Sequence, residues 1–378
     1  MLGTLPAAAS GQTEEPPAGY RKWLYGAVGG LVIGVPAYVS VDFGVSGCSS
    51  RNCFAPIAAA VGAVAGFLLG AELDESATRR WVAGPRLDLV GPAFDVPLVA
   101  ESMTAVPGGV ALLGQAGLAR ATSVAVSSTY AARGLLATAV LARHEALIAA
   151  SAASVVAFDQ NPASRGARRV FGSGGAALSA DGESRLVLGG EGTIRLLSVE
   201  GTGNDVTVTE DVAAQDPVPA RSLVWQPDVG VIWELAGSRV VGRSPETLEE
   251  LGSVALPGPG RALSVETGIG VVAGGESGVS VLDLSDPTTP VLLARYEGVR
   301  YAFDAEVAAG TVYVAAGEQG LVTLSLADPS APDVTGVVGT LGQPYAVVRN
   351  GGSLFVLDRE NRRLHVIETA SRPRTGSP

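Results

Sequence analysis

Two stretches of the sequence are near copies of each other: GVSVLDLSDPTTP at residues 278–290 and GLVTLSLADPSAP at residues 320–332. Each has a glycine, then alternating apolar positions, then an Asp-Pro pair. The copies begin at Gly278 and Gly320, 42 residues apart. A repeat of about 40–45 residues is the length of one four-stranded β-propeller blade, and a blade needs neighbours to bury its faces.

The same period runs through residues 85–368. Short Val-, Leu- and Ala-rich alternations are separated there by Gly, Asp, Asn and Pro, which is typical of many strands at regular spacing. A turn recurs at intervals of about 36–47 residues, the length of a blade. The seven turns lie near Gly109, Glu145, Gly182, Val229, Ile269, Gly310 and Gly351. They predict an all-β propeller of seven four-stranded blades, with six or eight as the alternative counts.

The two ends of this region complement each other. The last unit ends with NRRLHVIE, residues 361–368, and lacks the outermost strand of the earlier units. The segment PRLDLVGPAFDVPLVAE, residues 85–101, is similar to that missing strand followed by the opening of the next blade. We therefore predict that an N-terminal strand pairs with the last unit and closes the ring, which removes an exposed sheet edge.

The phrases GVSVLDLSDPTTPVLLARYEG (278–298) and GLVTLSLADPSAPDVTGVVG (320–339) resemble the LVIVD-repeat family of bacterial and archaeal β-propellers. The segment SVVAFDQNPASRG (154–166) resembles it in part. The resemblance implies the propeller fold. It brings no catalytic residues, because such repeats mark architecture and not a shared reaction.

The repeated Asp-Pro pairs have a local explanation. Asp286 and Asp328 can accept hydrogen bonds from the neighbouring backbone, and the prolines that follow fix φ, so that each pair turns the chain between strands. A calcium site is the alternative, but it would need several converging oxygen ligands, and the sequence has no Asp-x-Asp-x-Asp loop.

The N-terminal part of the chain differs in composition from the repeat region. After a polar tail, residues 1–22, two uncharged runs span 23–41 and 54–71. Each is long enough, at about 1.5 Å per residue, to approach the roughly 30 Å hydrocarbon thickness of a bilayer. We predict a transmembrane helical hairpin over residues 23–72, and two buried helices of a soluble domain are the alternative. A linker (73–84) and a flexible C-terminal tail (369–378) complete the organisation.

Glycines recur at every fourth position of both runs, and such stripes let helices approach closely in lipid. The six glycines are Gly26, Gly30, Gly34, Gly62, Gly66 and Gly70. In one interpretation the two stripes face only each other. In the other, at least one of them packs against another membrane protein.

The loop between the runs contains the only two cysteines of the chain, Cys48 and Cys53. We predict that they form a disulfide, which requires an oxidising compartment on that side of the membrane. Basic residues precede and follow the hairpin, at Arg21, Lys22, Arg79, Arg80 and Arg86. By the positive-inside rule both termini face the cytoplasm. The expected location is the bacterial inner membrane, with the inter-helix loop periplasmic and the propeller cytoplasmic.

Composition and motifs bound the chemistry. The net charge of −11 argues against nucleic acid as a partner, because phosphate binding needs a basic surface. His144 and His365 belong to no zinc motif, and Ser173, in the glycine-rich turn FGSGGA, has no base nearby. We expect no catalytic residue, no cofactor and no metal.

Trp225 and Trp233 flank the turn of the fourth blade, where they could contact a partner or pack half-buried between strands.

These features favour a non-catalytic scaffold or accessory subunit of a larger bacterial membrane complex, for example a respiratory or photosynthetic assembly. The hairpin would dock among integral membrane subunits in the lipid bilayer, and the propeller would clamp a membrane-extrinsic face. One alternative is an enzyme with a site in the central funnel. Asp304 and Glu306 could contribute to it, although a solvated turn is their simpler role. Another alternative is a membrane-tethered ligand sensor.

Overall fold

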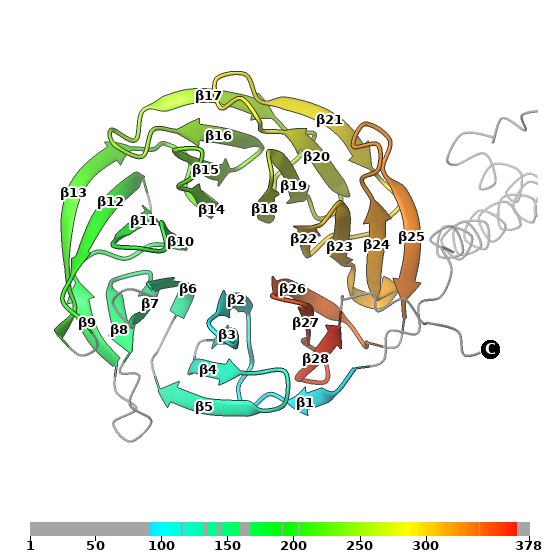
Figure 1. Ribbon diagram of the computed structural model, residues 1–378, viewed down its shortest axis with the longest axis horizontal. Helices are drawn as coiled ribbons and strands as arrows, with labels where there is room; N and C mark the ends of the chain where they lie inside the picture. The colour runs from blue at the N-terminus through cyan, green and yellow to red at the C-terminus, as the bar shows by residue number, and fades with distance from the viewer. Residues whose placement is uncertain are drawn as a thin grey trace, which may run out of the picture. The chain divides into compact units, whose positions relative to one another are not determined.

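The computed structural model describes residues 91–368, apart from 115, 132–134, 142–145, 159–166, 191, 203–204 and 340. The described strands form seven four-stranded antiparallel sheets arranged in a ring, as the blades of a propeller (Figure 1). This ring lies within the second of two compact units of the chain, residues 82–378. The predicted seven-bladed, all-β propeller is therefore confirmed.

Each blade runs from its innermost to its outermost strand in chain order, except that β1 completes the last blade. The innermost strands, nearest the axis, are β2 (Ser102–Val106), β6 (Leu135–Leu141), β10 (Ala177–Ala180), β14 (Ala220–Gln226), β18 (Ala262–Glu266), β22 (Asp304–Ala308) and β26 (Pro344–Asn350). The second strands are β3 (Gly109–Gly114), β7 (Ala146–Ser151), β11 (Arg185–Gly190), β15 (Val231–Ala236), β19 (Ile269–Ala273), β23 (Thr311–Ala315) and β27 (Ser353–Asp358).

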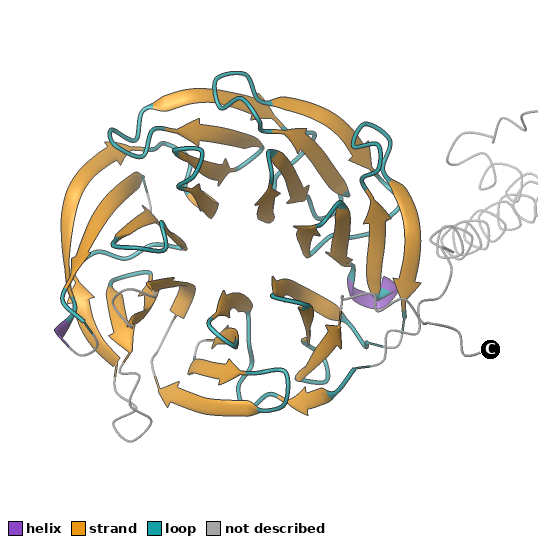
Figure 2. Cartoon of the chain, viewed as in Figure 1, coloured by secondary structure: helices purple, strands orange, loops and turns teal. Residues whose placement is uncertain are grey.

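The third strands are β4 (Gly117–Ala121), β8 (Val155–Phe158), β12 (Thr193–Glu200), β16 (Arg239–Arg243), β20 (Val279–Asp283), β24 (Leu321–Ser325) and β28 (Arg363–Glu368). The outermost strands are β5 (Val126–Ala131), β9 (Ala167–Phe171), β13 (Thr207–Gln215), β17 (Glu250–Ala255), β21 (Val291–Tyr296), β25 (Asp333–Val338) and β1 (Ala93–Asp95). Strands and the loops between them account for nearly all of this ring, and the short 3-10 helix η3 (Gly317–Gln319) connects β23 to β24 (Figure 2).

The ring closes by pairing its two ends. Strand β1 lies antiparallel to β28, with Ala93 opposite His365 and Asp95 opposite Arg363 (Figure 1). Outside that register, the Val96 N–H donates to the Arg362 carbonyl at 2.8 Å. The predicted closure by an N-terminal strand is confirmed, and β28 has no free edge in the closed ring.

The core lies between the blades. Every residue of β3 and of β15 is buried. These are the second strands, counted from the axis, of the first and fourth blades, and each has one neighbouring blade against one face and another against the other face. The apolar clusters reflect this arrangement: Val271 of the fifth blade and Val314 of the sixth belong to one cluster. The alternation seen in the sequence is therefore the alternation between two buried faces, with aliphatic residues on each.

The Asp-Pro turns hold their shape as predicted. The Asp286 carboxylate accepts the Thr288 N–H at 2.9 Å, and the Asp328 carboxylate accepts the Ser330 N–H at 3.0 Å. Hydrogen bonds from the hydroxyl and backbone of these neighbours hold the pKa of Asp286 and of Asp328 below its usual value. The turn at Asp286 also lies against the fourth blade, where a Cβ on Gly252 would come 2.5 Å from the Thr288 carbonyl oxygen.

The predicted transmembrane hairpin lies outside the described residues, and so do the six glycines of its stripes and the cysteine pair Cys48 and Cys53. In the part of the chain that is described, no helix has the length and apolar character to cross a membrane.

Candidate interaction site at the entry ring

A backbone irregularity marks the start of the innermost strand in three blades. In β14, Ala220 pairs with Ala236 and Ser222 with Leu235, so that Arg221 has no residue opposite it. Leu136 in β6 and Tyr345 in β26 are extra residues of the same kind. Such a β-bulge re-aims the side chain of the extra residue, and bulges are common beside functional sites.

In the other four blades the corresponding extra residue directly precedes the innermost strand and is not counted as part of it. The residue just before the strand donates its N–H to the carbonyl that lies opposite the strand's first residue. The four donors and acceptors are Glu101 to Leu113, Ala176 to Gly189, Arg261 to Ala273 and Phe303 to Ala315, at 2.6–2.9 Å. All seven blades thus have an extra residue at the same place.

These seven residues lie at one end of the propeller axis. Four antiparallel strands return the chain to the end where a blade began, so that all seven innermost strands run in the same direction. We call the seven residues the entry ring: Glu101, Leu136, Ala176, Arg221, Arg261, Phe303 and Tyr345. The framework repeats in every blade, whereas the side chain placed at the ring is acidic, basic, aromatic or aliphatic. A repeated scaffold with a varied set of side chains is suited to binding.

Three blades bring aromatic and basic side chains together at this end. The ring centroids of Tyr301 and Phe303 are 4.5 Å apart, and those of Phe303 and Tyr345 are 5.1 Å apart. The Arg261 guanidinium lies 5.4 Å from the Tyr301 centroid and donates to the Tyr301 hydroxyl at 3.0 Å. Arg359 lies 4.8 Å from the centroid of Tyr345. We call these five residues the aromatic–arginine cluster.

Two glycines make room for the cluster. Gly317 has φ +58°, and a Cβ there would come 2.8 Å from the Phe303 ring. Gly275 has φ +59°, and its Cβ would come 3.2 Å from the Tyr301 ring. Gly275 also exchanges two backbone hydrogen bonds with Ala302, each 3.0 Å long, which holds the segment between Tyr301 and Phe303 in place. The aromatic rings are therefore positioned before any partner binds.

Carboxylates lie further along the innermost strands of the same blades. The Asp304 carboxylate accepts the Val347 N–H at 3.0 Å, and Glu306 accepts the Ser264 hydroxyl at 3.1 Å. Burial raises the pKa of Asp304 to about 6 and that of Glu306 to about 7, and the Asp304 charge raises Glu306 further. The expectation of a solvated turn is wrong for both residues. They lie on β22 and bond to the neighbouring blades, because an innermost strand otherwise leaves backbone N–H groups unpaired.

No metal site accompanies these carboxylates. Among the described residues, no group of three or more His, Cys, Asp or Glu side chains could hold a metal ion.

The two tryptophans chosen from the sequence are buried. Trp225 is 6 % exposed and Trp233 is fully buried. The Trp233 indole N–H donates to Gln226 at 2.9 Å, and the Arg185 guanidinium lies 4.9 Å from the Trp225 ring centroid. This placement corrects the expectation of partner contacts: both indoles are part of the packing between strands, and a partner does not reach them.

Of the remaining candidates, the two that the structure describes, His365 and Ser173, take no part in the site. His365 lies on β28, where burial lowers its pKa, and His144 is outside the described residues. Ser173 lies in the connection between β9 and β10, as the sequence predicts.

The entry ring was not predicted from the sequence, although the sequence contains a signal for it. Each ring residue precedes one of the seven turns by 6 residues, as in Tyr345 to Gly351, to 9 residues, as in Leu136 to Glu145. This spacing alone does not single out the ring residues, because nothing in the sequence shows that they meet.

Comparisons with known proteins agree with the fold. The model of the LVIVD repeat family matches residues 263–298, which include most of the fifth blade. That match confirms the resemblance for one repeat. No match was found among curated proteins.

Several solved structures are similar at low sequence identity. The WD40 domain of Neurospora crassa Pan2 has a TM-score of 0.57 and 14% identity, covering 72% of this chain and 90% of that chain. A chain of the Mitotic Checkpoint Complex has a TM-score of 0.62 and 11% identity, covering 76% and 94%. BamB from Moraxella catarrhalis has a TM-score of 0.52 and 10% identity, covering 73% and 98%. At such identities these likenesses establish the β-propeller fold.

Proposed function

We propose that this protein is a non-catalytic scaffold or accessory subunit of a larger bacterial membrane complex, such as a respiratory or photosynthetic assembly. The propeller binds a membrane-extrinsic face of the partner through its entry-ring end, and the segment 23–72 docks among integral membrane subunits. The observation that carries this proposal is the aromatic–arginine cluster, which unites three blades on one end of the propeller.

The composition of the cluster supports a protein partner. Tyrosine, tryptophan and arginine are the residue types most enriched among those that dominate the binding energy of protein interfaces. Tyr301, Phe303 and Tyr345 are each partly exposed, and Arg359 is exposed. Because the rings already contact one another and the arginines, little side-chain freedom remains to be lost on binding. A propeller of the same fold occurs in the Mitotic Checkpoint Complex, which is a multiprotein assembly.

The membrane part of the proposal is supported by the sequence. The uncharged runs at 23–41 and 54–71 are long enough to span a bilayer, and glycines recur at every fourth residue in each. In lipid, close contact between such stripes is a main source of helix association. We assign the propeller to the cytoplasmic side of the inner membrane on the positions of the basic residues.

The test is purification of the tagged full-length protein from native membranes in mild detergent, with mass spectrometry and an absorption spectrum of what remains bound. Two variants accompany the parent: Tyr345→Ala with Arg359→Ala, and Gly62, Gly66 and Gly70 all changed to leucine. The control is Arg239→Ala, which removes an exposed arginine on the third strand of the fourth blade.

We expect stoichiometric recovery of a defined membrane complex with the parent and the control, and loss of the complex with both test variants. Recovery of the protein as a monodisperse particle without partners would overturn the proposal that it is a scaffold subunit. A complex that survives Tyr345→Ala with Arg359→Ala, but not the glycine changes, would place the contact in the membrane segment and remove the role of the cluster.

A further inference from the structure

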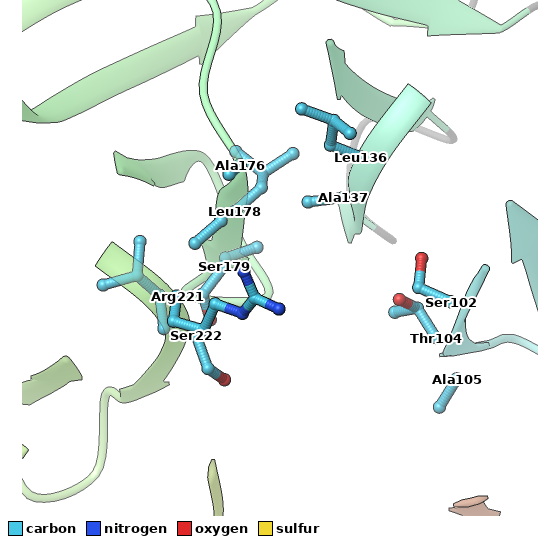
Figure 3. Close-up of a pocket in the computed structure, with 13 residues that line it drawn as sticks. Ser102, Thr104, Ala105, Leu136, Ala137, Ala176, Leu178, Ser179, Arg221 and Ser222 are labelled. Atoms are coloured by element: carbon cyan, nitrogen blue, oxygen red, sulfur yellow. The ribbon is translucent and has the colours of Figure 1, made fainter. Parts of the chain in front are cut away.

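A pocket of about 410 Å³ lies beside the axis, between the innermost strands β2, β6, β10 and β14. This volume is within the range of roughly 300–1,000 Å³ that is usual for small-molecule sites. Figure 3 shows Arg221, Ser179 and Ser222 on one side of the pocket, with Ser102 and Thr104 across from them. The pocket therefore presents one charged group and several hydroxyls to the same space.

Arg221 is placed in the pocket by the fold. It is the extra residue of the β14 bulge, between the paired residues Ala220 and Ser222, so that the backbone directs its side chain out of the regular strand pattern. It is exposed, and its guanidinium makes no hydrogen bond or ion pair with another described residue. A guanidinium has five N–H donors in a planar fork that matches the two oxygens of a carboxylate.

A second donor is available next to it. The Ser179 hydroxyl oxygen accepts the Trp225 backbone N–H at 3.0 Å, which leaves the Ser179 hydroxyl proton free to donate. Both the Arg221 guanidinium and the Ser179 hydroxyl can thus donate a hydrogen bond to an acceptor group of a ligand in the pocket. Among the described residues that line the pocket none is acidic, and Arg221 is the only one of them that carries a charge.

Three carboxylates on the innermost strands of the fifth and sixth blades have partners of their own. Asp304 accepts a backbone N–H from β26, Glu306 accepts the Ser264 hydroxyl, and Glu266 pairs with Arg349 at 3.1 Å. None of them lines this pocket. Apolar surface completes the lining: Leu136 is 40% exposed and lies at the pocket with Ala137 and Ala176 (Figure 3).

We propose that this pocket binds a small organic carboxylate. The carboxylate oxygens accept from Arg221 and from the Ser179 hydroxyl, and the hydrocarbon part of the ligand lies against Leu136 and Ala176. Arg221, Leu136 and Ala176 are three neighbouring members of the entry ring, so that the site uses the positions at which the blades differ. The inference does not depend on the scaffold role, because the aromatic–arginine cluster belongs to the fifth to seventh blades and the pocket to the first four.

The test uses the purified full-length protein in uncharged detergent and isothermal titration calorimetry at fixed ionic strength. The probes are valerate, the shorter acid acetate, the neutral amide valeramide, which has the same shape as valerate, and inorganic phosphate. The variants are Arg221→Gln, which removes the charge, Arg221→Lys, which keeps the charge without the planar fork, and Leu136→Ser. The matched control is Arg239→Gln, an exposed arginine of the same blade outside the pocket.

We expect valerate to bind at least tenfold more tightly than valeramide. Arg221→Gln should remove that preference, Arg221→Lys should keep part of it, and Arg239→Gln should leave it unchanged. Leu136→Ser should weaken valerate while leaving acetate binding unaffected. Equal binding of acid and amide, absence of binding by every probe, or an Arg221→Gln protein with parental affinity would overturn the proposal. Phosphate binding tighter than valerate would overturn the assignment to carboxylates in favour of a general oxyanion site.

Discussion

At the scale of single residues, a buried group of one arginine and two carboxyl side chains, here called the triad, joins the third and fourth blades. Arg243 pairs with Glu234 on β15, donates to Asp216 at 3.1 Å and donates to the Leu248 carbonyl at 3.0 Å. Glu234 is fully buried, and burial raises its pKa to about 8. Asp216 lies in the connection from β13 to β14, so that the triad ties this connection to the blade that follows.

Arg243→Met should lower the free energy of unfolding of the propeller by about 3–5 kcal/mol, because it leaves two buried carboxyl groups without their cation. Denaturant titration of the full chain, followed by tryptophan fluorescence, measures the loss. The control is Arg239→Met, which breaks the exposed pair with Glu250 and should cost less than about 1 kcal/mol. Equal losses in the two variants would show that the triad is not a stabilising contact.

A second prediction concerns pH. The folded-state pKa of Glu306, about 7, lies above its ordinary value of 4.5, and that of Asp304, about 6, lies above 3.8. The folded state therefore binds more protons than the unfolded state in this range, so that the stability contributed by these groups falls as pH rises from about 4 to 7. Glu306→Gln keeps an acceptor for the Ser264 hydroxyl but carries no charge.

We expect Glu306→Gln to be more stable than the parent at pH 8, by roughly 1–3 kcal/mol, and about equal to it at pH 5. Melting temperatures from pH 5 to pH 8 measure the difference. A parallel pH dependence in the parent and the variant would contradict the assignment of this titration to Glu306.

At the scale of elements, the Asp-Pro turn does more than reverse the chain. The turn of the fifth blade lies on the outer strands of the fourth, where glycines leave room for its carbonyls: Pro287 O lies 3.0 Å from a Cβ placed on Gly242, and Thr288 O lies 2.5 Å from one on Gly252. The repeated phrase thus also supplies a contact between blades.

Gly252→Ala should displace this turn, because the added Cβ meets a backbone carbonyl that cannot rotate away. We expect a loss of about 1–3 kcal/mol, the usual range for overpacking, measured by thermal unfolding. Gly339→Ala is the control, since a Cβ there meets nothing within 4 Å and should change stability by less than about 0.5 kcal/mol. Equal effects at the two sites would show that the turn is free to move.

At the scale of the whole molecule, stability depends on closing the ring. Strand β1 is short, yet it covers the edge of β28, and the residues around it join the cluster that also contains Phe355 and Leu112. An open ring would expose the edge of β28 to pairing with other chains.

Val96→Pro removes the N–H that bonds Arg362 at 2.8 Å and changes the side-chain volume little. We expect a lower melting temperature and a greater tendency to aggregate, measured by light scattering during heating. Asp95→Pro is the control: successive N–H groups of a strand alternate in direction, so that the Asp95 N–H faces away from β28, and proline is tolerated there. If both variants behave like the parent, closure by β1 contributes little.

Much of the fold could be predicted from the sequence. The blade length, the seven turns, the closing strand and the Asp-Pro turns all follow from local periodicity and turn chemistry, and each is present in the structure. The candidate site could not be predicted in the same way. Trp225 and Trp233 are of a residue type that is enriched at interfaces, but whether an indole is exposed depends on which blade lies against it, and both are buried.

The sequence by itself therefore determined the repeat, because the periodicity of a strand depends only on residues that are close together in the chain. What only the tertiary structure decided is which side chains meet. Arg261, Phe303 and Tyr345 are separated by about forty residues each and become neighbours because the ring brings equivalent positions of successive blades together. The same holds for Leu136, Ala176 and Arg221 at the pocket. These side chains come together only when the blades close into a ring, so that the sequence of one blade does not predict their contacts.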